Sequence, residues 1–259
     1  MDKISEFQHQ VELNIKALGS DPDVTLQSRQ WMLSVSRYDY SYNFSWMGRP
    51  IIQFPQDIVA MQELVMQVRP DLIIETGIAH GGSLILSASL LALLDYEDAV
   101  REQRPLDPAK TTRRVLGIDI DIRPHNRMAI ESHPMAHRID MLQGSSIDPS
   151  IIQQVHAYAT HYDKILVCLD SNHTHEHVLA ELNAYAPLTS TGSYCIVFDT
   201  LIEDVPEKPF VDRPWKPGNN PKTAVWEWLK SHPEFEIDKS IQDKLQITVA
   251  PDGFLKKIN

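Results

Sequence analysis

The 259-residue sequence has few cysteines and no long apolar run. Its two cysteines, Cys168 and Cys195, each lie in a short apolar stretch, which is typical of buried thiols and excludes a disulfide framework. No stretch approaches the ~18 apolar residues of a membrane-spanning helix, and the first residues lack the apolar region of a signal peptide. We therefore expect a soluble, cytoplasmic protein with no membrane span.

Basic residues are also scarce. The chain has 24 lysines and arginines against 35 aspartates and glutamates, a formal net charge of −11. A protein with this charge repels phosphate groups, so we expect neither a nucleic-acid partner nor binding to an anionic membrane. The content of 42% apolar and 23% charged residues is that of a globular protein and argues against disorder.

Hydrophobic spacing divides the chain into two parts. Residues 1–55 are predicted to form an N-terminal helical and aromatic extension, with helices at 4–18 and 25–35 and an irregular aromatic segment at 38–46. Within residues 56–259, the predicted strands are 71–75, 115–119, 164–170 and 193–199. The predicted helices are 56–68, 83–94, 151–158, 175–185 and 221–229. Residues 95–114 are predicted to form a surface insertion, and the turn signal at 251–253 predicts a hairpin. The alternation of strands and helices indicates an α/β fold with a doubly wound, Rossmann-like sheet.

An acidic residue lies at the end of each of the four predicted strands: Glu75, Asp119, Asp170 and Asp199. In doubly wound sheets the ligand crevice lies at the carboxyl ends of the strands. We therefore expect these four carboxylates to surround one ligand site. The alternative is that they are ordinary acids at the beginning of loops.

The turn after the first strand, Gly77-Ile-Ala-His-Gly-Gly82, lets the backbone approach a ligand and exposes the N-terminus of the next helix. It has neither the G-x-G-x-x-G pattern nor the lysine of a P-loop. The next strand-end acid, Asp119, lies 42 residues after Gly77 and not about 20, which disfavours a nicotinamide cofactor. Glu75 before the turn would repel a pyrophosphate, whereas it suits a cation. S-adenosylmethionine, a nucleoside with a sulfonium and an amino group, fits this chemistry, with Asp119 accepting from the ribose hydroxyls.

Five longer motifs carry a family resemblance. They are Ile74–Ser83 (IETGIAHGGS), Gly117–Asp121 (GIDID), Leu169–His177 (LDSNHTHEH), Val197–Thr200 (VFDT) and Pro214–Trp226 (PWKPGNNPKTAVW). Over most of residues 38–230 the chain resembles the cephalosporin hydroxylase-like family of S-adenosylmethionine-dependent O-methyltransferases, which includes rhamnosyl O-methyltransferases. The residues that we predict to contact the cofactor are Glu75, Gly77, Gly81, Ser83, Asp119, Asp121, Ser145 and Asp170.

This family in turn resembles the metal-assisted, catechol-type O-methyltransferases, which implies a Mg²⁺ site. Those enzymes hold the ion with an acid after the fourth strand and two adjacent residues after the fifth, positions that here are Asp170, Phe198 and Asp199. Phe198 stands where family members with a Glu-Asp pair have the glutamate, so this chain has one carboxylate fewer. We predict Asp170 and Asp199 as ligands, with Asn172, an acceptor oxygen and water to complete the octahedron.

His173 is the candidate catalytic base, acting beside Asp170. It lies three residues after Asp170, where the catechol-type enzymes have a lysine base, and a neutral imidazole can accept a hydroxyl proton. The alternative for His173 is a solvated position at the start of a helix, or a contact with Glu176. His173 and His177 are also four residues apart and could share a helix face, which leaves open a zinc- or iron-dependent hydrolase or oxygenase.

The leading prediction is a metal-assisted, S-adenosylmethionine-dependent O-methyltransferase that acts on a hydroxyl of a small-molecule or glycan acceptor. The choice of a sugar or natural product as acceptor follows from the resemblance alone. A non-catalytic protein that only binds S-adenosylmethionine is a further alternative, favoured by Phe198. Residues 38–46 and 206–220 are expected either to fold over the crevice or to pack the N-terminal helices onto the sheet. A homo-oligomer is left open.

Overall fold

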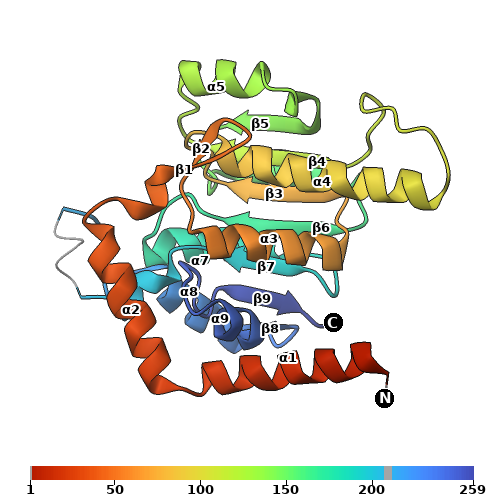
Figure 1. The fold of residues 1–259 in the computed structure, drawn as a ribbon. Coiled ribbons are helices and arrows are strands. Elements are labelled where there is room, and N and C mark those ends of the chain that lie inside the picture. The colour runs from red at the N-terminus through yellow and green to blue at the C-terminus, as the bar shows by residue number, and fades with distance from the viewer. Residues whose placement is uncertain (1, 207–211) are drawn as a thin grey trace.

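The structure, a computed structural model, describes residues 2–206 and 212–259 and is built around a seven-stranded sheet (Figure 1). The strand order is β5-β4-β3-β6-β7-β9-β8. The strands are β3 (Leu72–Thr76), β4 (Arg114–Asp119), β5 (Ile139–Gln143), β6 (Ile165–Leu169), β7 (Tyr194–Val197), β8 (Phe235–Ile237) and β9 (Phe254–Lys257). Strands β5, β4, β3, β6 and β7 are parallel, and β9 is antiparallel to both β7 and β8.

Helices cover both faces of the sheet. They are α1 (Lys3–Gly19), α2 (Pro22–Ser36), α3 (Pro55–Val68), α4 (Gly82–Arg101), α5 (Pro124–Glu131), α6 (Pro149–Ala159), α7 (His175–Tyr185), α8 (Pro221–Trp228) and α9 (Lys239–Leu245). One apolar core joins the sheet to α3, α4 and α9, and a second joins it to α6, α7 and α8. Ile73 belongs to the first core, whereas Leu72 and Ile74 belong to the second, as expected for a strand buried on both faces. In the described part of the chain, no helix has the length and apolarity needed to cross a bilayer.

The order of the strands places a crevice between β3 and β6. The chain runs from β3 outward through β4 to β5, and then returns to place β6 on the other side of β3. Such a reversal leaves a gap at the carboxyl ends of the two central strands, which is where ligands bind in this architecture. The predicted doubly wound sheet is therefore confirmed.

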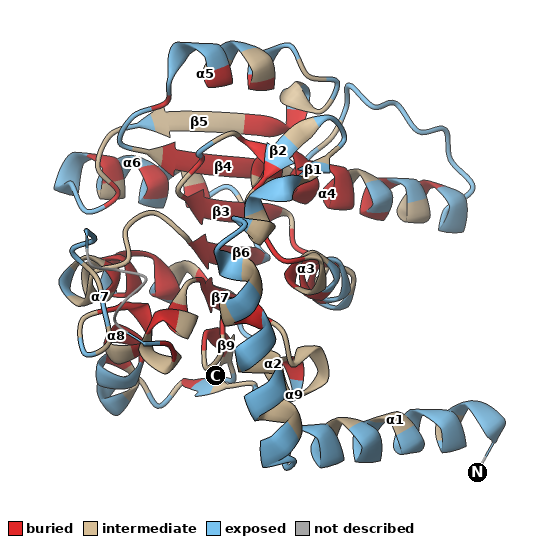
Figure 2. Cartoon of the chain, turned by 60° about the vertical axis from the view of Figure 1, so that its left-hand side comes forward, coloured by how far each residue is buried: buried red, intermediate tan, exposed pale blue. Residues whose placement is uncertain are grey.

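The N-terminal extension reaches this crevice through a small hairpin of β1 (Phe44–Trp46) and β2 (Arg49–Ile51). Of the aromatic stretch that we expected to be irregular, only Phe44–Trp46 forms a strand, and Met47 and Gly48, with φ values of 45° and 85°, close the tight turn to β2. The Trp46 indole N–H donates to the Ser89 hydroxyl of α4 at 2.9 Å, which fixes the hairpin to the core. In contrast, α1 has no buried residue and is exposed along most of its length (Figure 2). The division into residues 1–55 and 56–259 stays a prediction.

Three local predictions are wrong. Helix α4 continues to Arg101, into the first part of the predicted insertion, because Asp98 on its last turns pairs with Arg113 at 2.8 Å and with Arg69. Strand β5 and helix α5 were not predicted, since β5 is only half buried and its sequence IDMLQ has no continuous apolar run. The turn at 251–253 does not close a hairpin, because the segment before it forms no strand and β9 pairs with β7 and β8.

Candidate active site

The turn after β3 lies directly against the end of β6. Gly77 has a φ of +89°, a left-handed conformation that favours glycine, and a Cβ at this position would lie 2.1 Å from the carbonyl oxygen of Asp170. The backbone N–H of Asp170 donates to the Thr76 carbonyl oxygen at 2.9 Å. Glycine is therefore required at position 77 because the two loops that border the crevice touch there.

Side chains from three other segments hold this turn in place. Asp119 at the end of β4 accepts hydrogen bonds from the backbone N–H groups of residues 78 and 79, at 2.8 and 3.3 Å. Asn126 of α5 donates to the carbonyl oxygen of residue 79 at 2.9 Å, and Arg49 of β2 donates through Nε to the carbonyl oxygen of residue 80 at 3.0 Å. Asp119 therefore lies at the turn as its strand-end position predicts, whereas the sequence gives no signal for Arg49.

Glu75 is buried in β3, behind the glycine turn, and is not exposed at the surface of the turn. Its side chain is buried, and it accepts a hydrogen bond from the hydroxyl of Ser83 in the first turn of α4. Burial raises the pKa of Glu75 to about 7, although the bond from Ser83 acts in the opposite direction. Glu75 thus ties β3 to the helix that the glycine turn leads into.

Asp170, His173 and Asp199 form a cluster, named here the acidic centre, at the ends of β6 and β7. The Nε2 atom of His173 lies 3.0 Å from Oδ2 of Asp199, and one donor atom from each of the three side chains lies within 4.8 Å of the others. Asp199 has a φ of +56°, an uncommon conformation for aspartate that the surrounding loops hold in place. Two carboxylates and an imidazole at these separations can share a proton or hold a cation.

The acidic centre concentrates negative charge. Burial, followed by repulsion from Asp199 and Glu75, raises the pKa of Asp170 well above its usual value. A positively charged ligand at the centre would relieve this repulsion and favour the ionised carboxylates.

Two cavities meet at the acidic centre. The inner cavity, of about 290 Å³, extends from the centre along Gly77, Ser83 and Phe198. The outer cavity, of about 660 Å³, extends from the centre toward α2 and the segment that contains Trp215. His173 and Asp199 line both cavities, and so do Ser41 and Tyr42.

The aromatic residues of the extension both pack and line the site. Tyr40 contacts the rings of Trp31, Phe44 and Phe54, with ring centroids 5.1 to 5.8 Å apart. Tyr40 also lines the outer cavity, and Tyr42 lines both cavities. The two expectations for this segment are therefore both met. Of the predicted covering loop 206–220, residues 207–211 lie outside the described residues.

The structure separates the two histidines that could have formed a metal pair. His177 lies 3.0 Å from the hydroxyl of Ser146 and 3.2 Å from that of Ser171, and 3.5 Å from Glu181 Oε1. Within the described part of the chain, the only three-residue donor group of metal-binding type includes His173 but not His177. The interpretation as a hydrolase or oxygenase with a His173–His177 metal pair is therefore wrong.

Phe198 and Asn172 lie close to the centre in sequence, and only the role expected of Asn172 changes. Phe198 is buried in the apolar core and lines the inner cavity, so it offers no oxygen to a cation. The side-chain oxygen of Asn172 accepts hydrogen bonds from the N–H and the hydroxyl of Thr174, both at 2.9 Å, and so fixes the start of α7. The third donor beside Asp170 and Asp199 is His173.

The remaining predicted cofactor residues lie around the crevice. A Cβ at Gly81 would lie 2.4 Å from the Ile130 side chain of α5, so this glycine lets α5 pack against the turn that precedes α4. Asp121 is exposed, and its backbone N–H donates to Asp119 at 2.9 Å. Ser145 is half buried in the loop after β5. None of these three side chains lines the inner cavity.

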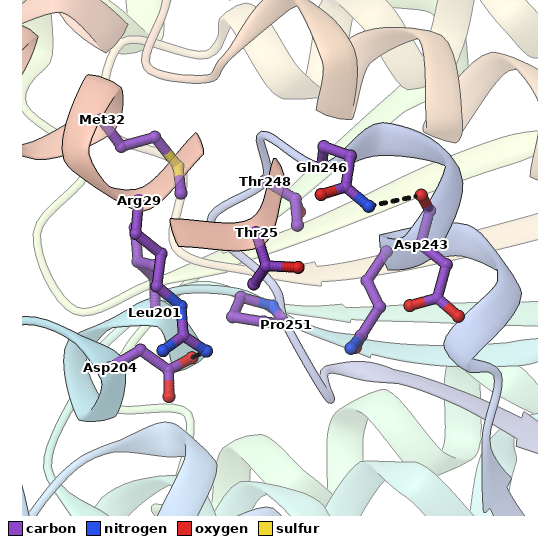
Figure 3. Close-up of a pocket in the computed structure, with 10 residues that line it drawn as sticks. Thr25, Arg29, Met32, Leu201, Asp204, Asp243, Gln246, Thr248 and Pro251 are labelled. Carbon is purple, nitrogen blue, oxygen red and sulfur yellow. Dashed lines mark hydrogen bonds and ion pairs between the residues drawn. The ribbon is translucent and has the colours of Figure 1, made fainter. Parts of the chain in front are cut away.

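A third, much smaller cavity of about 70 Å³ lies between α2, residues 201–204, α9 and the segment that follows α9 (Figure 3). Arg29 of α2 pairs there with Asp204 at 3.6 Å, at the end of the short helix η4 (Thr200–Asp204) that follows Asp199. Asp204 also accepts from the buried Lys222 at 2.7 Å. This cavity is far smaller than a cofactor, and its ion pairs fix α2 beside the outer cavity.

The family model and the relatives that match this chain carry the same name. The family model described as Rhamnosyl O-methyltransferase/CmcI matches residues 38–258. The rhamnosyl O-methyltransferase of Mycobacterium bovis (strain BCG / Pasteur 1173P2) is 29% identical over 216 residues, which cover 82% of this chain and 77% of the relative. The rhamnosyl O-methyltransferase of Mycobacterium leprae (strain TN) is 28% identical over 215 residues, which cover 82% of each chain.

Solved structures resemble the fold. A structure of cmcI with Mg and SAM has a TM-score of 0.53 at 16% sequence identity, and covers 84% of this chain and 78% of its own. The O-methyltransferase from Bacillus cereus in complex with SAH has a TM-score of 0.50 at 15% identity, with 81% of each chain covered. The predicted family and the class of S-adenosylmethionine-dependent O-methyltransferases are thereby confirmed. Since the family model extends over most of its length, the chain belongs to the rhamnosyl O-methyltransferase/CmcI family.

Proposed function

We propose that this protein transfers the methyl group of S-adenosylmethionine to a hydroxyl group of a sugar or a related natural product. One observation carries the proposal: His173 and Asp199 line both cavities, so that ligands in the two cavities would meet at the acidic centre. The names of the mycobacterial relatives support a sugar hydroxyl as the acceptor. The donor belongs in the inner cavity and the acceptor in the outer one.

The inner cavity has the chemistry that the methyl donor needs. Its described lining contains Asp170 and Asp199 but no lysine or arginine, so it favours a ligand with a sulfonium and an amino group. Gly77 lines this cavity and lets the turn pass close to Asp170, and Asp119 keeps carboxylate acceptor positions beside the turn. We propose that Glu75, Gly81, Ser83, Asp121 and Ser145 complete the binding region, through the turn that they support or border.

His173 is the proposed proton acceptor. Its Nε2 atom is held by Asp199 at 3.0 Å, and the edge of its ring meets Trp215 with centroids 4.8 Å apart, so the imidazole has a fixed orientation. Asp199 would stabilise the imidazolium that forms when His173 takes the proton of the acceptor hydroxyl. Positioning the acceptor oxygen in line with the methyl group provides the rest of the rate increase.

The acidic centre also fits a divalent cation. Asp170, His173 and Asp199 would hold it, and their donor atoms lie close enough together to do so. When bound, such an ion would polarise the acceptor oxygen. Mg²⁺ prefers oxygen ligands, whereas the nitrogen of His173 also suits Mn²⁺ or Zn²⁺, so metal identity needs a direct measurement. A cytoplasmic location and a homo-oligomeric state stay predictions.

The test is a mass-spectrometric search for methylated products with a panel of glycosides and phenols, using S-adenosylmethionine with a deuterated methyl group. We expect a product that carries the deuterated methyl, formed by the wild type and by His161→Ala, an exposed control histidine, but lost in Asp170→Asn. Calorimetric titration with S-adenosylhomocysteine separates the alternatives. Tight binding without any methylated product would favour a non-catalytic binding protein, and the absence of binding would refute the proposal.

A further inference from the structure

We propose that the outer cavity selects acceptors that carry an anionic group, a carboxylate or a phosphate, in addition to the hydroxyl that is methylated. This inference rests on the proposed function, since it names the class of acceptor for the same site. Its basis is the distribution of charge along the two cavities: the described lining of the inner cavity has Asp170 and Asp199 and no lysine or arginine, whereas the outer cavity has two arginines as well as Asp39 and Asp199.

The outer cavity contains two arginines, Arg37 and Arg213, whereas the described lining of the inner cavity contains none. Neither guanidinium lies within ion-pair distance of a carboxylate in residues 2–206 and 212–259. Each instead lies over an aromatic ring, Arg37 at 4.8 Å from the centroid of Tyr38 and Arg213 at 5.3 Å from that of Trp215. Stacking on a ring leaves the N–H groups at the guanidinium edge free to bind a ligand oxygen.

Trp215 connects the arginine to the reaction centre. Its ring meets the imidazole of His173 at 4.8 Å and lies beneath Arg213. A ligand group bound to Arg213 would thus lie about one indole ring away from a hydroxyl at His173. The planar guanidinium binds carboxylate and phosphate through two parallel hydrogen bonds, which fixes the orientation of the ligand as well as its position.

The acidic centre would enforce this orientation. Asp170 and Asp199 repel an anion, so an acceptor with one charged end and one hydroxylated end enters with the hydroxyl toward His173. Asp39 also lines the outer cavity, which disfavours a second anionic group there. The volume of about 660 Å³ lies within the range of about 300–1,000 Å³ of small-molecule pockets. Phe54, Leu201 and Val205 supply apolar walls for the body of the acceptor.

The experiment compares ligands that differ only in charge. The protein, saturated with S-adenosylhomocysteine, is titrated calorimetrically with 4-nitrophenyl β-D-glucuronide and with 4-nitrophenyl β-D-glucoside, and separately with glucose 6-phosphate and with glucose. We expect at least about tenfold tighter binding of one anionic ligand than of its neutral partner, weakened by added salt. The first pair reports on carboxylate recognition and the second on phosphate recognition.

Variants assign the effect to the two arginines. In the double variant Arg37→Gln/Arg213→Gln the preference should vanish while the affinity for the neutral ligand stays within about threefold. Arg101→Gln, at an exposed arginine on α4 outside both cavities, is the matched control and should keep the preference. Equal affinities within both pairs, binding of no ligand, or a preference that persists in the double variant would overturn the inference. Because binding needs no turnover, a preference without any methylated product would refute the proposed function, and the anion recognition by the outer cavity would then stand as ligand binding alone.

Discussion

Replacing Asp57 with asparagine should stabilise the protein above neutral pH and leave its stability in acid nearly unchanged. Asp57, in the first turn of α3, is only 1% exposed and accepts hydrogen bonds from the Thr248 hydroxyl and, at 3.1 Å, from the Val249 N–H. The carbonyl oxygen of Val249 in turn accepts from the N–H of Leu201 at 3.1 Å, two residues after Asp199. Asp57 therefore supports the loop that positions the acidic centre.

The magnitude follows from the pKa of Asp57. Burial raises it from 3.8 to about 7, with the two hydrogen bonds lowering it and repulsion from Asp199 adding to the increase. A carboxyl group that is a weaker acid in the folded state stabilises the fold below its unfolded pKa, and this contribution is lost as the pH rises toward about 7. The stability that the wild type loses between acid and pH values above about 7 amounts to about 4 kcal/mol at most. Asparagine does not ionise, so the Asp57→Asn variant would not show this loss.

Urea unfolding followed by tryptophan fluorescence at about pH 5 and at about pH 8 measures this difference. The gain of Asp57→Asn over wild type should grow by roughly 2–3 kcal/mol between the two pH values, since part of the loss occurs below pH 5. The variant should still lose some stability as the pH rises from about 5 to about 8, because the pKa of Glu75 is also raised to about 7. Asp107→Asn, at an exposed aspartate, is the control. A gain that is the same at both pH values would refute the reasoning.

The remaining predictions concern the two ligand sites. Asp119→Ala should weaken S-adenosylmethionine binding about tenfold or more in calorimetry, because it removes the hydrogen bonds that hold the glycine turn and those proposed for the ribose; an unchanged affinity would contradict this role. Gly77→Ala should lower both stability and cofactor affinity more than Gly48→Ala does. Both glycines have a positive φ, but only Gly77 has a backbone atom 2.1 Å from where the added methyl would lie. Equal effects of the two substitutions in thermal unfolding would show that the contact is unimportant. His173→Ala should reduce turnover on the order of 10²–10⁴-fold with cofactor affinity unchanged, and near-full turnover would exclude it as the base.

The sequence predicts the centre of the sheet better than its margins. Four strands could be located because each is an apolar run that ends in an acid, as buried parallel strands do. Strand β5 lies at the edge, is mostly half buried, and has its apolar residues interrupted by Asp140, so it has no such run. The hairpin predicted at 251–253 was wrong because β8, which pairs with β9, lies before α9 and not directly before the turn.

In the site, too, the residues that follow a sequence pattern could be predicted, whereas those placed by tertiary packing could not. Asp170 and Asp199 could be predicted because each lies just after the end of a parallel strand, and such ends share one edge of the sheet. His173 could be predicted from its place three residues after Asp170, through the family resemblance. Arg49 could not, because its contact with the carbonyl oxygen of residue 80 spans 31 residues and depends on how the hairpin packs. The helical spacing of His173 and His177 was misleading, since His173 precedes α7 and His177 lies within it.

His173 has two proposed uses that compete for the single lone pair of a neutral imidazole. Its Nε2 atom lies 3.0 Å from Asp199, so without a cation Nε2–H faces Asp199 and Nδ1 is free to accept the proton, whereas a cation between Asp170 and Asp199 would take Nε2 as its ligand. An imidazole that ligates a cation through Nε2 carries its proton on Nδ1 and cannot at the same time accept a hydroxyl proton. Protein with and without metal would then activate the acceptor differently, by polarisation in one case and by proton transfer in the other.

Phe198 makes this competition specific to the chain, because a carboxylate at that position could ligate the ion and release His173 for the proton. We therefore expect Phe198→Glu to increase Mg²⁺ affinity and to make methyl transfer sensitive to EDTA. In the wild type, EDTA should leave part of the activity, and that part should disappear in His173→Ala. If EDTA abolishes wild-type turnover completely, proton transfer to a metal-free His173 is not sufficient, and the ion is required in spite of the missing carboxylate.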